Sequence, residues 1–450
     1  YTFISSCTEL VNLLFAGLWM TYMLQYRFFL SGFLLCLFPL ISYADDTATR
    51  LFERNAPLVY QVKVIDKASG NKSIIGSGFQ VTRSGVIATN YHVVSDYVLD
   101  TDRYSIEILD HEDNSHRSSL ISFDIVHDLA LLQTEGLDEQ ELALSQQTLA
   151  QGNRIYSMGN PNDLGMTIVE GTYNGLVEAS RYNKYLFSGS LNPGMSGGPV
   201  FDSDGDVIGI NVSKGGEQIS FLVPVRHLVE LMSHGYEPLS TDDYNAHAVD
   251  YLVNDQDIYY RSLLDAEWLT RDFIDFELPD KIDDSLKCWG HSEDDKDVRY
   301  QETHRHCKAE DEIYLNSDFY TGSFNFDYIS ISSEELNTIQ FYKLLESNYS
   351  VSSFSNSYDK QETTNFACHT KFINIGSKSE QHETPWKVTS CIRAYVEYEG
   401  LYDAGLIAMY ADSSGGRHDA LRITLKTSGI SKQNIARLHK KFMDKVRWKH

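Results

Sequence analysis

Short apolar runs separated by turn-forming residues fill the chain from Pro57 to about residue 225. The first of them read L-V-Y-Q-V-K-V-I, S-I-I-G-S-G-F-Q-V and V-I-A-T-N, with K-A-S-G-N-K and T-R-S-G between them, a pattern typical of successive β-hairpins. Further strands are predicted at 104–109, 129–132, 154–158, 166–178, 184–188, 206–213 and 218–223. Because no long helical pattern separates them, the sequence favours an all-β sandwich or a pair of barrels over a parallel α/β sheet.

The pattern changes after this β-rich region. Pro224 opens a short amphipathic helix, in whose first turn proline is tolerated. Farther on, helices are predicted near Y-Y-R-S-L-L-D-A-E-W-L and at S-S-E-E-L-N-T-I-Q-F-Y-K-L-L, where Ser332 and Glu335 have capping-box spacing. Strands are predicted at T-K-F-I-N-I, W-K-V-T-S-C-I-R-A-Y-V-E-Y and A-G-L-I-A-M-Y. We therefore predict an all-β domain over 50–235, a linker over 236–249 and a smaller α+β domain over 250–450.

An apolar segment precedes the first domain. Between Arg27 and Ala44, one positive residue is followed by an apolar run and by Ser42-Tyr43-Ala44, with small residues where a signal peptidase cleaves. We interpret residues 1–44 as an upstream segment and a signal peptide that is removed after Ala44. An uncleaved membrane anchor is the alternative, because residues 10–24 are also apolar. Both interpretations imply export, to the periplasm or the extracellular space.

Four of the six cysteines lie in the C-terminal half, at Cys288, Cys307, Cys368 and Cys391. In an exported domain, four cysteines suggest two disulfides. Three pairings are possible, and we favour the sequence-local one, which joins Cys288 to Cys307 and Cys368 to Cys391. A zinc site is the alternative, with ligands drawn from Cys288, His291, His304, His306 and Cys307. Paired cysteines of exported proteins are usually oxidised, so we prefer the disulfides and predict no metal.

Composition narrows the classes of partner. The formal net charge of −25 argues against a large nucleic-acid footprint, because phosphate binding requires clustered Lys and Arg. The last twenty residues are basic, and helical spacing places Ile435, Leu438, Phe442 and Val446 on one face. We expect that face to pack on its own domain. Membrane association is expected only through this helix or an uncleaved N-terminal segment, and the oligomeric state stays open.

The stretch N-P-G-M-S-G-G-P-V-F, residues 192–201, carries the candidate chemistry. A phosphate-binding loop would need a helix after it and a lysine within it, whereas here a strand follows and lysine is absent. Ser196 becomes a nucleophile only when a base takes its proton and a third group orients that base. His92 and Asp128 each border an apolar run. The chain order His, Asp, Ser is one of the known orders in which these three residues form a catalytic triad. Asp124 is an alternative to Asp128.

These motifs resemble the trypsin-like serine proteases of chymotrypsin fold, and most closely the bacterial Deg/HtrA branch. The resemblance covers roughly residues 50–232. The separations of 36 residues from His92 to Asp128 and 68 from Asp128 to Ser196 suit that family. The matching segments are G-S-G-F at 76–79, A-T-N-Y-H-V-V at 88–94, H-D-L-A-L-L at 127–132, G-N-P at 159–161, G-M-S-G-G-P at 194–199 and G-I-N-V-S at 209–213.

The resemblance implies a double β-barrel and a serine endopeptidase that cleaves proteins or peptides through an acyl-enzyme, without a cofactor. Ser196 would attack the scissile carbonyl, His92 would accept its proton and Asp128 would orient the imidazole. The backbone N–H groups of Gly194 and Ser196 would form the oxyanion hole. Gly197 and Gly198 are expected to let the substrate backbone approach. A protease-like protein that binds or adheres without turnover is the alternative.

The chain also departs from its relatives. Met195 replaces the aspartate that pairs with a newly cut N-terminus in digestive proteases, so that activation is not expected. Residues 250–450 show no recognisable PDZ pattern. The primary pocket is predicted to involve Ser190 at its base, Ser213, Lys214 and Gly215 along the substrate-pairing strand, and Ser220 or Phe221 on the facing wall. With no carboxylate there, cleavage after Lys or Arg is disfavoured, small or medium apolar residues are the first expectation, and Lys214 leaves an acidic preference open.

Overall fold

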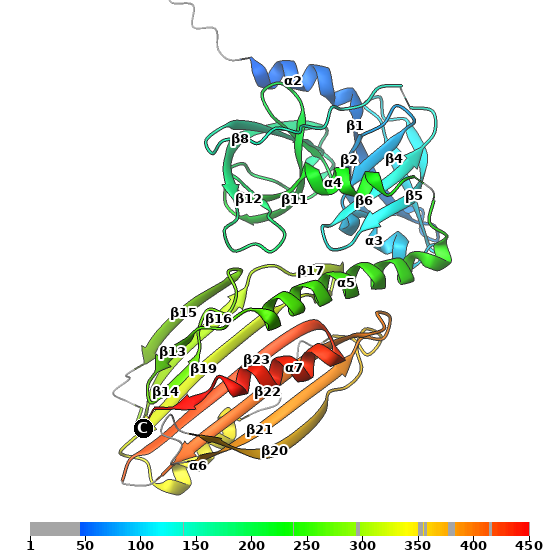
Figure 1. Cartoon of the computed structure of the whole chain (residues 1–450). Helices are drawn as coiled ribbons and strands as arrows, with labels where there is room; N and C mark the ends of the chain where they lie inside the picture. The colour runs from blue at the N-terminus through cyan, green and yellow to red at the C-terminus, as the bar shows by residue number, and fades with distance from the viewer. Residues whose placement is uncertain are drawn as a thin grey trace, which may run out of the picture. The chain divides into compact units, whose positions relative to one another are not determined.

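The computed structural model describes residues 46–449, except 138, 237, 294–297, 350–353, 355–357, 377–382 and 414–415 (Figure 1). The predicted signal peptide within 1–44 lies outside the described residues. Helix α2 (Thr47–Asn55) and the 3-10 turn η1 (Ala56–Leu58) lead into the strands.

Two closed antiparallel barrels follow, which confirms the predicted double barrel. The first contains β1 (Val59–Asp66), β2 (Asn71–Gln80), β3 (Val86–Thr89), β4 (Tyr104–Leu109), β5 (Ser115–Asp124) and β6 (Leu129–Thr134), in the order β1-β2-β3-β6-β5-β4, with helix α3 (Tyr91–Leu99) after β3. In β4, Ile106 and Ile108 are buried while their neighbours are more exposed, the alternation of a strand with one face on a core. Strand β5 was not predicted, because it begins with polar residues.

The second barrel contains β7 (Arg154–Gly159), β8 (Thr167–Leu176), β9 (Tyr185–Phe187), β10 (Pro199–Phe201), β11 (Val207–Gly216) and β12 (Ile219–Pro224), in the order β10-β11-β12-β9-β8-β7. The turn η2 (Pro161–Asp163) follows β7, and helix α4 (Val225–Ser233) begins directly after Pro224, as the sequence predicts. Strand β10 was missed because three residues are too few to show a period.

The C-terminal part is built on a seven-stranded antiparallel sheet, which with its helices gives an α+β arrangement (Figure 1). Its order is β15 (Leu286–Glu293), β16 (Gln301–Ala309), β19 (Phe324–Ser333), β23 (His418–Ser431), β22 (Leu401–Asp412), β21 (Glu383–Ala394) and β20 (Ala367–Gly376). Smaller sheets are formed by β13 (Thr270–Phe273), β14 (Phe276–Pro279) and β24 (Arg447–Trp448), and by the hairpin of β17 (Ile313–Asn316) and β18 (Phe319–Thr321). The part is not smaller than the barrels: its elements from α5 to β24 span 244–448, against 47–233 for α2 to α4.

The helices of the C-terminal part differ from the predictions in two places. Helix α5 (Tyr244–Asp265), after the turn η3 (Thr241–Asp243), begins inside the predicted linker 236–249. Tyr244, Ala248 and Leu252 are buried on one face in a core shared with the first barrel, and this spacing of four residues was hidden by turn-forming neighbours.

The other helices are α6 (Thr338–Asn348) and α7 (Lys432–Asp444). The capping box of α6 is made by Asn337 and Gln340, not by the predicted Ser332 and Glu335, because Ser332 is still within strand β19. In α7 the predicted apolar face packs in the core of the C-terminal sheet: Ile435 is 5% exposed, and Leu438 and Phe442 are fully buried together with Val446.

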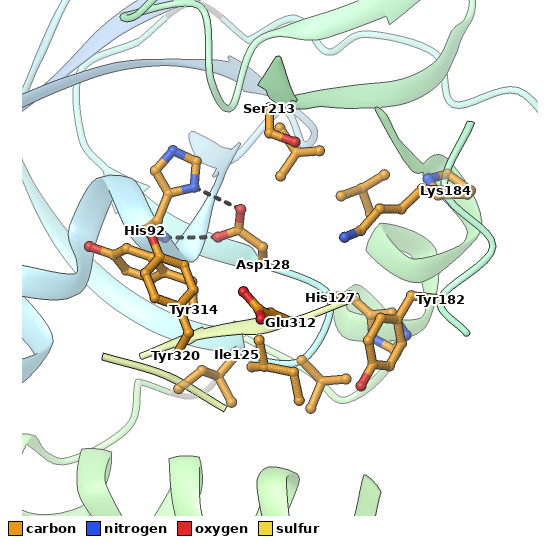
Figure 2. A pocket seen from close by; sticks show the side chains of 15 residues that line it. His92, Ile125, His127, Asp128, Tyr182, Lys184, Ser213, Glu312, Tyr314 and Tyr320 are labelled. Carbon is orange, nitrogen blue, oxygen red and sulfur yellow. Dashed lines mark hydrogen bonds and ion pairs between the residues drawn. The ribbon is translucent and has the colours of Figure 1, made fainter. Parts of the chain in front are cut away.

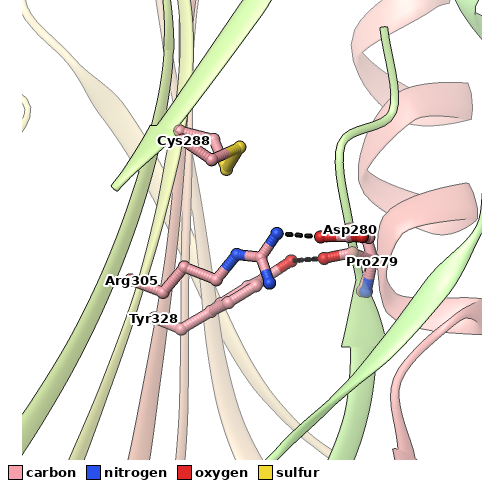
Figure 3. Close-up of a disulfide and its surroundings, with 6 residues drawn as sticks. Pro279, Asp280, Cys288, Arg305 and Tyr328 are labelled. Atoms are coloured by element: carbon pink, nitrogen blue, oxygen red, sulfur yellow. Dashed lines mark hydrogen bonds and ion pairs between the residues drawn. A yellow bond between two sulfur atoms is a disulfide. The ribbon is translucent and has the colours of Figure 1, made fainter. Parts of the chain in front are cut away.

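Two disulfides fasten the two edges of the seven-stranded sheet. Cys288 on edge strand β15 is bonded to Cys307 on β16, and Cys368 on the opposite edge strand β20 is bonded to Cys391 on β21. This is the sequence-local pairing, and it uses the thiols that a zinc site would need. Beside the first disulfide, Arg305 pairs with Asp280 (Figure 3). An edge strand has hydrogen-bonding neighbours on one side only, so a covalent link there limits fraying.

Removing one disulfide is expected to loosen one edge. The pair Cys288→Ala and Cys307→Ala opens a 19-residue connection and should reduce the local stability of β15 by about 3 kcal/mol. Hydrogen exchange measured by mass spectrometry should then speed up in β15 and stay unchanged in β20. The matched pair Cys368→Ala and Cys391→Ala should give the reverse pattern. Equal acceleration at both edges in either variant would contradict this assignment.

Candidate active site

His92 and Asp128 meet where helix α3 begins and the turn before β6 ends. The imidazole Nδ1 of His92 lies 2.7 Å from Oδ2 of Asp128, and the backbone N–H of His92 donates to Oδ1 at 2.9 Å (Figure 2). The Asn90 side chain donates to the Asp128 carbonyl at 2.7 Å. Asp128 has a φ of 57°, a left-handed conformation that aspartate tolerates better than most residues. These contacts fix both sides of the turn, so the carboxylate faces the ring.

The environment of His92 favours its charged form. Burial disfavours the imidazolium, but the negative charge of Asp128 and its hydrogen bond outweigh burial, and together they raise the pKa of His92 above its ordinary value of 6.5. The side chains of His92 and Asp128 are 25% and 16% exposed, so the pair is partly shielded from solvent. An imidazole held in this way donates its Nδ1–H to the Asp128 carboxylate and leaves Nε2 available as a base.

Asp124, the alternative acid, holds a different histidine. Its carboxylate accepts hydrogen bonds from the Val126 and His127 backbone N–H groups at 2.9 and 3.0 Å, and its Oδ2 lies 2.6 Å from His127 Nδ1. Burial is the largest single effect on the pKa of Asp124, and it raises that pKa. The hydrogen bonds and the charge of His127 outweigh burial, so the pKa of Asp124 is lowered. The two acids of this turn therefore face two different imidazoles, and Asp128 is the one that faces His92.

Ser196 lies in a loop of the second barrel, and hydrogen bonds with β2 of the first barrel hold this loop in place. The Ser77 backbone N–H donates to the Ser196 carbonyl at 2.7 Å, and the Ser77 hydroxyl donates to the Gly194 carbonyl at 2.7 Å. The Ser196 hydroxyl itself donates to the Val212 carbonyl at 3.3 Å. Within the described part of the chain it makes no hydrogen bond with His92. Val212, whose carbonyl accepts this bond, lines one pocket together with His92 and Asp128.

The loop around Ser196 leaves two backbone donors unused. The N–H groups of Met195, Gly197 and Gly198 each donate to a backbone carbonyl. Among the described residues, the N–H groups of Gly194 and Ser196, the predicted oxyanion donors, donate to none. Two such donors on either side of one residue are suited to binding an oxyanion.

The glycines of this loop are required by packing. Gly194 has a φ of +96°, and a Cβ there would lie 2.4 Å from the Asn160 carbonyl oxygen. At Gly197, with φ of +83°, a Cβ would lie 2.2 Å from the Ser77 carbonyl oxygen. A Cβ at Gly198 would approach the Met158 carbonyl at 2.1 Å. The last two glycines therefore admit neighbouring backbone of the same chain, rather than substrate as the sequence analysis expected. Met195 is fully buried in the second barrel.

The residues predicted for the primary pocket lie in the second barrel. Ser220 is fully buried, donates to the Gly189 carbonyl at 2.8 Å and accepts from the Leu191 N–H at 3.3 Å, so its hydroxyl braces the segment on both sides of half-buried Ser190. On β11, Ser213, Lys214 and Gly215 are exposed. In the register with β12, Phe221 lies opposite Ser213, and Ser220 opposite Lys214. The predicted residues are thus neighbours, and Ser220 holds the backbone on both sides of Ser190 through hydrogen bonds.

Several residues of the site were not found from the sequence. A pocket beside His92 is also lined by Lys184, and by Glu312, Tyr314 and Tyr320 of the C-terminal part (Figure 2). No motif marks them, because they become neighbours of His92 only through folding. Ser77 could have been noticed, since it lies within G-S-G-F. Across the described ranges no group of three or more His, Cys, Asp or Glu side chains is arranged to hold a metal ion. None of the described helices is both long and apolar enough to cross a membrane.

Comparison with known proteins finds similarity to peptidases over part of the chain. Residues 76–210 match the family model of the trypsin-like peptidase domain. The chain is 31% identical over 161 residues to the "Probable periplasmic serine endoprotease DegP-like" of Pseudomonas fluorescens, which covers 34% of this chain and 33% of that protein. It is also 31% identical over 201 residues to the mitochondrial serine protease HTRA2 of Bos taurus, covering 41% of this chain and 42% of that protein.

The chain thus spans less than half the length of these relatives. Among solved structures, it is similar to the serine endoprotease from Yersinia pestis, with 26% identity and a TM-score of 0.36, over 42% of this chain and 65% of that one. The residues matched by the family model, 76–210, include His92, Asp128 and Ser196. Residues 76–210 therefore match a trypsin-like peptidase domain, and over this part the chain is similar to the Deg/HtrA-type serine proteases.

Proposed function

We propose that the chain is a serine endopeptidase that hydrolyses protein or peptide substrates with Ser196 as nucleophile, His92 as general base and Asp128 as the group that orients His92. The observation that carries the proposal is the double contact of Asp128, which binds both the ring Nδ1 and the backbone N–H of His92 beside the Ser196 loop. This contact fixes the tautomer in which Nε2 can accept a proton.

The reaction would begin when the Ser196 hydroxyl turns from Val212 toward His92, a change between staggered rotamers. Oγ then attacks the scissile carbonyl carbon while His92 Nε2 takes the hydroxyl proton. The oxyanion accepts hydrogen bonds from the free N–H groups of Gly194 and Ser196. His92 next gives its proton to the leaving amine, and water, activated by the same imidazole, hydrolyses the acyl-enzyme. Asp128 stays ionised and stabilises the imidazolium throughout.

Export is the second part of the proposal. Relatives described as periplasmic support an extracytoplasmic location, and so do the two disulfides, which persist in oxidising compartments. The alternative of an inactive binding protein draws on one observation, the bond from Ser196 to Val212 rather than to His92. Because apo enzymes often hold their catalytic hydrogen bonds loosely, we favour the enzyme.

A fluorophosphonate probe tests the nucleophile. The wild-type chain should be labelled on Ser196, because only a serine activated by a base attacks such a probe at a useful rate. Ser196→Ala should abolish labelling, and the control Ser203→Ala, at an exposed turn position of the same barrel, should label like wild type. A folded wild-type protein that stays unlabelled between pH 6 and 9 would favour the inactive binding protein.

The pH dependence of labelling follows from the pKa of His92. The base must be neutral to accept the serine proton, and the pKa of His92 is raised above 6.5. The labelling rate should therefore be full at alkaline pH and fall as the pH drops through a midpoint above 6.5. Rates measured at constant ionic strength across this range give the midpoint. A midpoint below 6.5 would mean that Asp128 does not act on the reactive imidazole.

Replacing the orienting carboxylate should be costly for the rate while leaving the fold intact. In Asp128→Asn the amide can no longer hold the productive tautomer of His92, so kcat/KM should fall by about 10³-fold to 10⁴-fold. The control Asp102→Asn changes an exposed turn residue and should retain activity. Peptide hydrolysis by the two variants, with circular dichroism to verify folding, gives the comparison. A loss of less than tenfold in Asp128→Asn would remove Asp128 from the mechanism.

A further inference from the structure

A pocket of about 300 Å³ lies beside His92, and one of its walls comes from outside the two barrels. That wall belongs to the segment 311–322, which contains the β17–β18 hairpin and is called here the wall segment. Figure 2 shows Glu312 and Tyr314 of this segment on the same pocket as Asp128, with Lys184 reaching in from the second barrel. The C-terminal part therefore contributes side chains to the cleft that holds the candidate catalytic base.

The wall segment is held against the first barrel at the catalytic histidine. The Tyr314 ring packs edge-on against the His92 ring with centroids 5.8 Å apart, and its hydroxyl lies 3.3 Å from the Ser95 hydroxyl. The Tyr91 hydroxyl donates to the Leu315 carbonyl at 3.3 Å. These contacts come from Tyr91, His92 and Ser95 in the first two turns of α3, so the hairpin packs on the start of the helix that carries His92.

A second set of contacts holds the segment to the second barrel. The buried Asp311 carboxylate accepts from the Arg181 backbone N–H at 2.6 Å and from the Ser180 hydroxyl at 3.3 Å, and it pairs with Lys184 at 3.2 Å. Asp311 is only 4% exposed, so this cluster is shielded from solvent. Since both barrels bind it, the wall segment bridges the cleft as a fixed part of the site.

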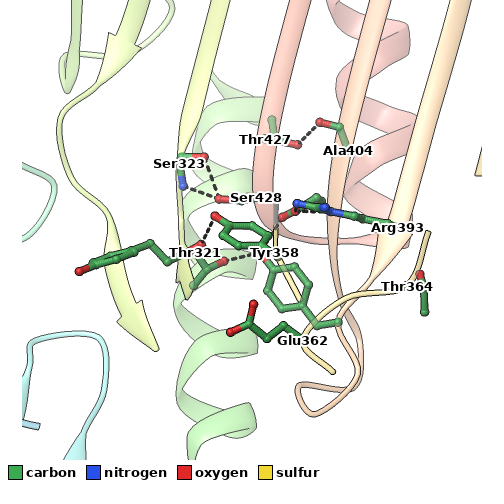
Figure 4. Close-up of polar contacts among 12 residues, drawn as sticks. Thr321, Ser323, Tyr358, Glu362, Thr364, Arg393, Ala404, Thr427 and Ser428 are labelled. Carbon is green, nitrogen blue, oxygen red and sulfur yellow. Dashed lines mark hydrogen bonds and ion pairs between the residues drawn. The ribbon is translucent and has the colours of Figure 1, made fainter. Parts of the chain in front are cut away.

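The base of the hairpin is anchored in the C-terminal sheet (Figure 4). The Thr321 hydroxyl donates to the Tyr395 hydroxyl at 2.8 Å, and Tyr395 in turn donates to the buried Asp403 carboxylate at 2.7 Å. The Ser323 and Ser428 hydroxyls lie 2.8 Å apart. With its base fixed in this way, the hairpin presents a defined surface to the pocket.

The charges around the pocket are not balanced. Lys184 is neutralised by Asp311, with 3.2 Å between the charged atoms. Among the described residues, the one ion pair of Glu312 is with Lys308 at 3.9 Å, and because both side chains are more than 40% exposed this pair is weak. The Glu312 carboxylate thus faces the pocket with most of its charge uncompensated, and the carboxylate of Asp128 lines the same space.

The remaining walls suit a long side chain with an apolar stem. Tyr314 and Tyr320 stand edge to face with centroids 5.4 Å apart, and Val212 and Ile313 add aliphatic surface. Lysine and arginine have such a stem and carry a cation at its end. A cation is also attracted to the faces of tyrosine rings. An aspartate or glutamate side chain would instead meet like charge at Glu312.

We propose that the wall segment builds a substrate subsite beside His92 that selects a lysine or arginine side chain, with Glu312 as its specificity-determining residue. This inference rests on the proposed peptidase function. The subsite adjoins the predicted primary pocket without coinciding with it, because Ser213 lines it whereas Ser190 and Ser220 do not. It assigns the C-terminal part a role in choosing the substrate.

A positional peptide library tests the subsite with the full chain. Fluorogenic peptides that carry Arg, Lys, norleucine or Glu at one position at a time should show one position where Arg and Lys are preferred over norleucine. Glu312→Gln should reduce this preference about threefold to tenfold. Glu310→Gln changes an exposed neighbour outside the pocket lining and should keep it. Glu312→Lys should shift the preference at the same position toward Glu.

Two results would overturn the subsite. One is a preference for Arg and Lys that survives Glu312→Gln unchanged, and the other is a wild-type preference for Glu or norleucine at every position. Labelling of Ser196 by the fluorophosphonate probe is scored separately in each variant, so loss of the catalytic site is distinguished from loss of specificity.

Binding gives a readout that does not need turnover. In the Ser196→Ala background, fluorescein-labelled octa-alanine peptides with a single Arg or norleucine at each position in turn are compared by anisotropy. Tighter binding of one Arg peptide, lost when Glu312→Gln is added, supports the subsite even if the chain does not hydrolyse peptides. Equal binding of the Arg and norleucine peptides would refute it.

Discussion

The candidate site depends on one buried serine at the boundary between the barrels. Ser77 is fully buried, and each of its polar groups is used: its N–H binds the Ser196 carbonyl, its hydroxyl binds the Gly194 carbonyl and accepts from the Asn160 N–H, and its carbonyl accepts from the Thr89 hydroxyl. These bonds join β2 of one barrel to the serine loop of the other. A side chain without a hydroxyl at this position would leave the Gly194 carbonyl and the Asn160 N–H without this partner, which is costly. The relative position of His92 and Ser196 follows from this contact.

The contact also explains the composition of the serine loop. Because β2 approaches the loop so closely, a Cβ at Gly197 would collide with the Ser77 carbonyl. A Cβ at Gly194 would collide with the carbonyl of Asn160, which follows β7. The same tight turns direct the N–H groups of Gly194 and Ser196 away from internal acceptors. Packing against the first barrel and the presentation of two free donors are therefore produced by the same backbone conformation. Oxyanion stabilisation of this kind needs donors that are fixed before the reaction.

The C-terminal part is joined to the first barrel through a common apolar core. Tyr91 and Phe123 of the barrel belong to one buried cluster with Tyr244 of α5 and with Leu315 and Phe319 of the hairpin. Tyr91 directly precedes His92, so the residue next to the candidate base is packed by both parts of the chain. Burial of apolar surface is the main driving force for such an association. It places the wall segment at the cleft, where its polar and aromatic side chains shape the space beside the imidazole.

The sequence by itself was enough to predict most of the barrel strands and to single out the candidate residues His92, Asp128 and Ser196. The turn glycines and the apolar neighbours of these residues can be recognised locally, because period and turn chemistry act over a few positions, whereas the polar start of β5 and the three residues of β10 gave no such pattern. Tertiary structure decided the rest. Asp124 and Asp128 lie on one turn, and only the docking of α3 selects which of them meets His92. Likewise, Glu312 and Tyr314 follow no motif, since their place beside His92 is created by contacts between residues more than 200 positions apart, such as Tyr91 with Leu315. Packing at that range leaves no local pattern to read.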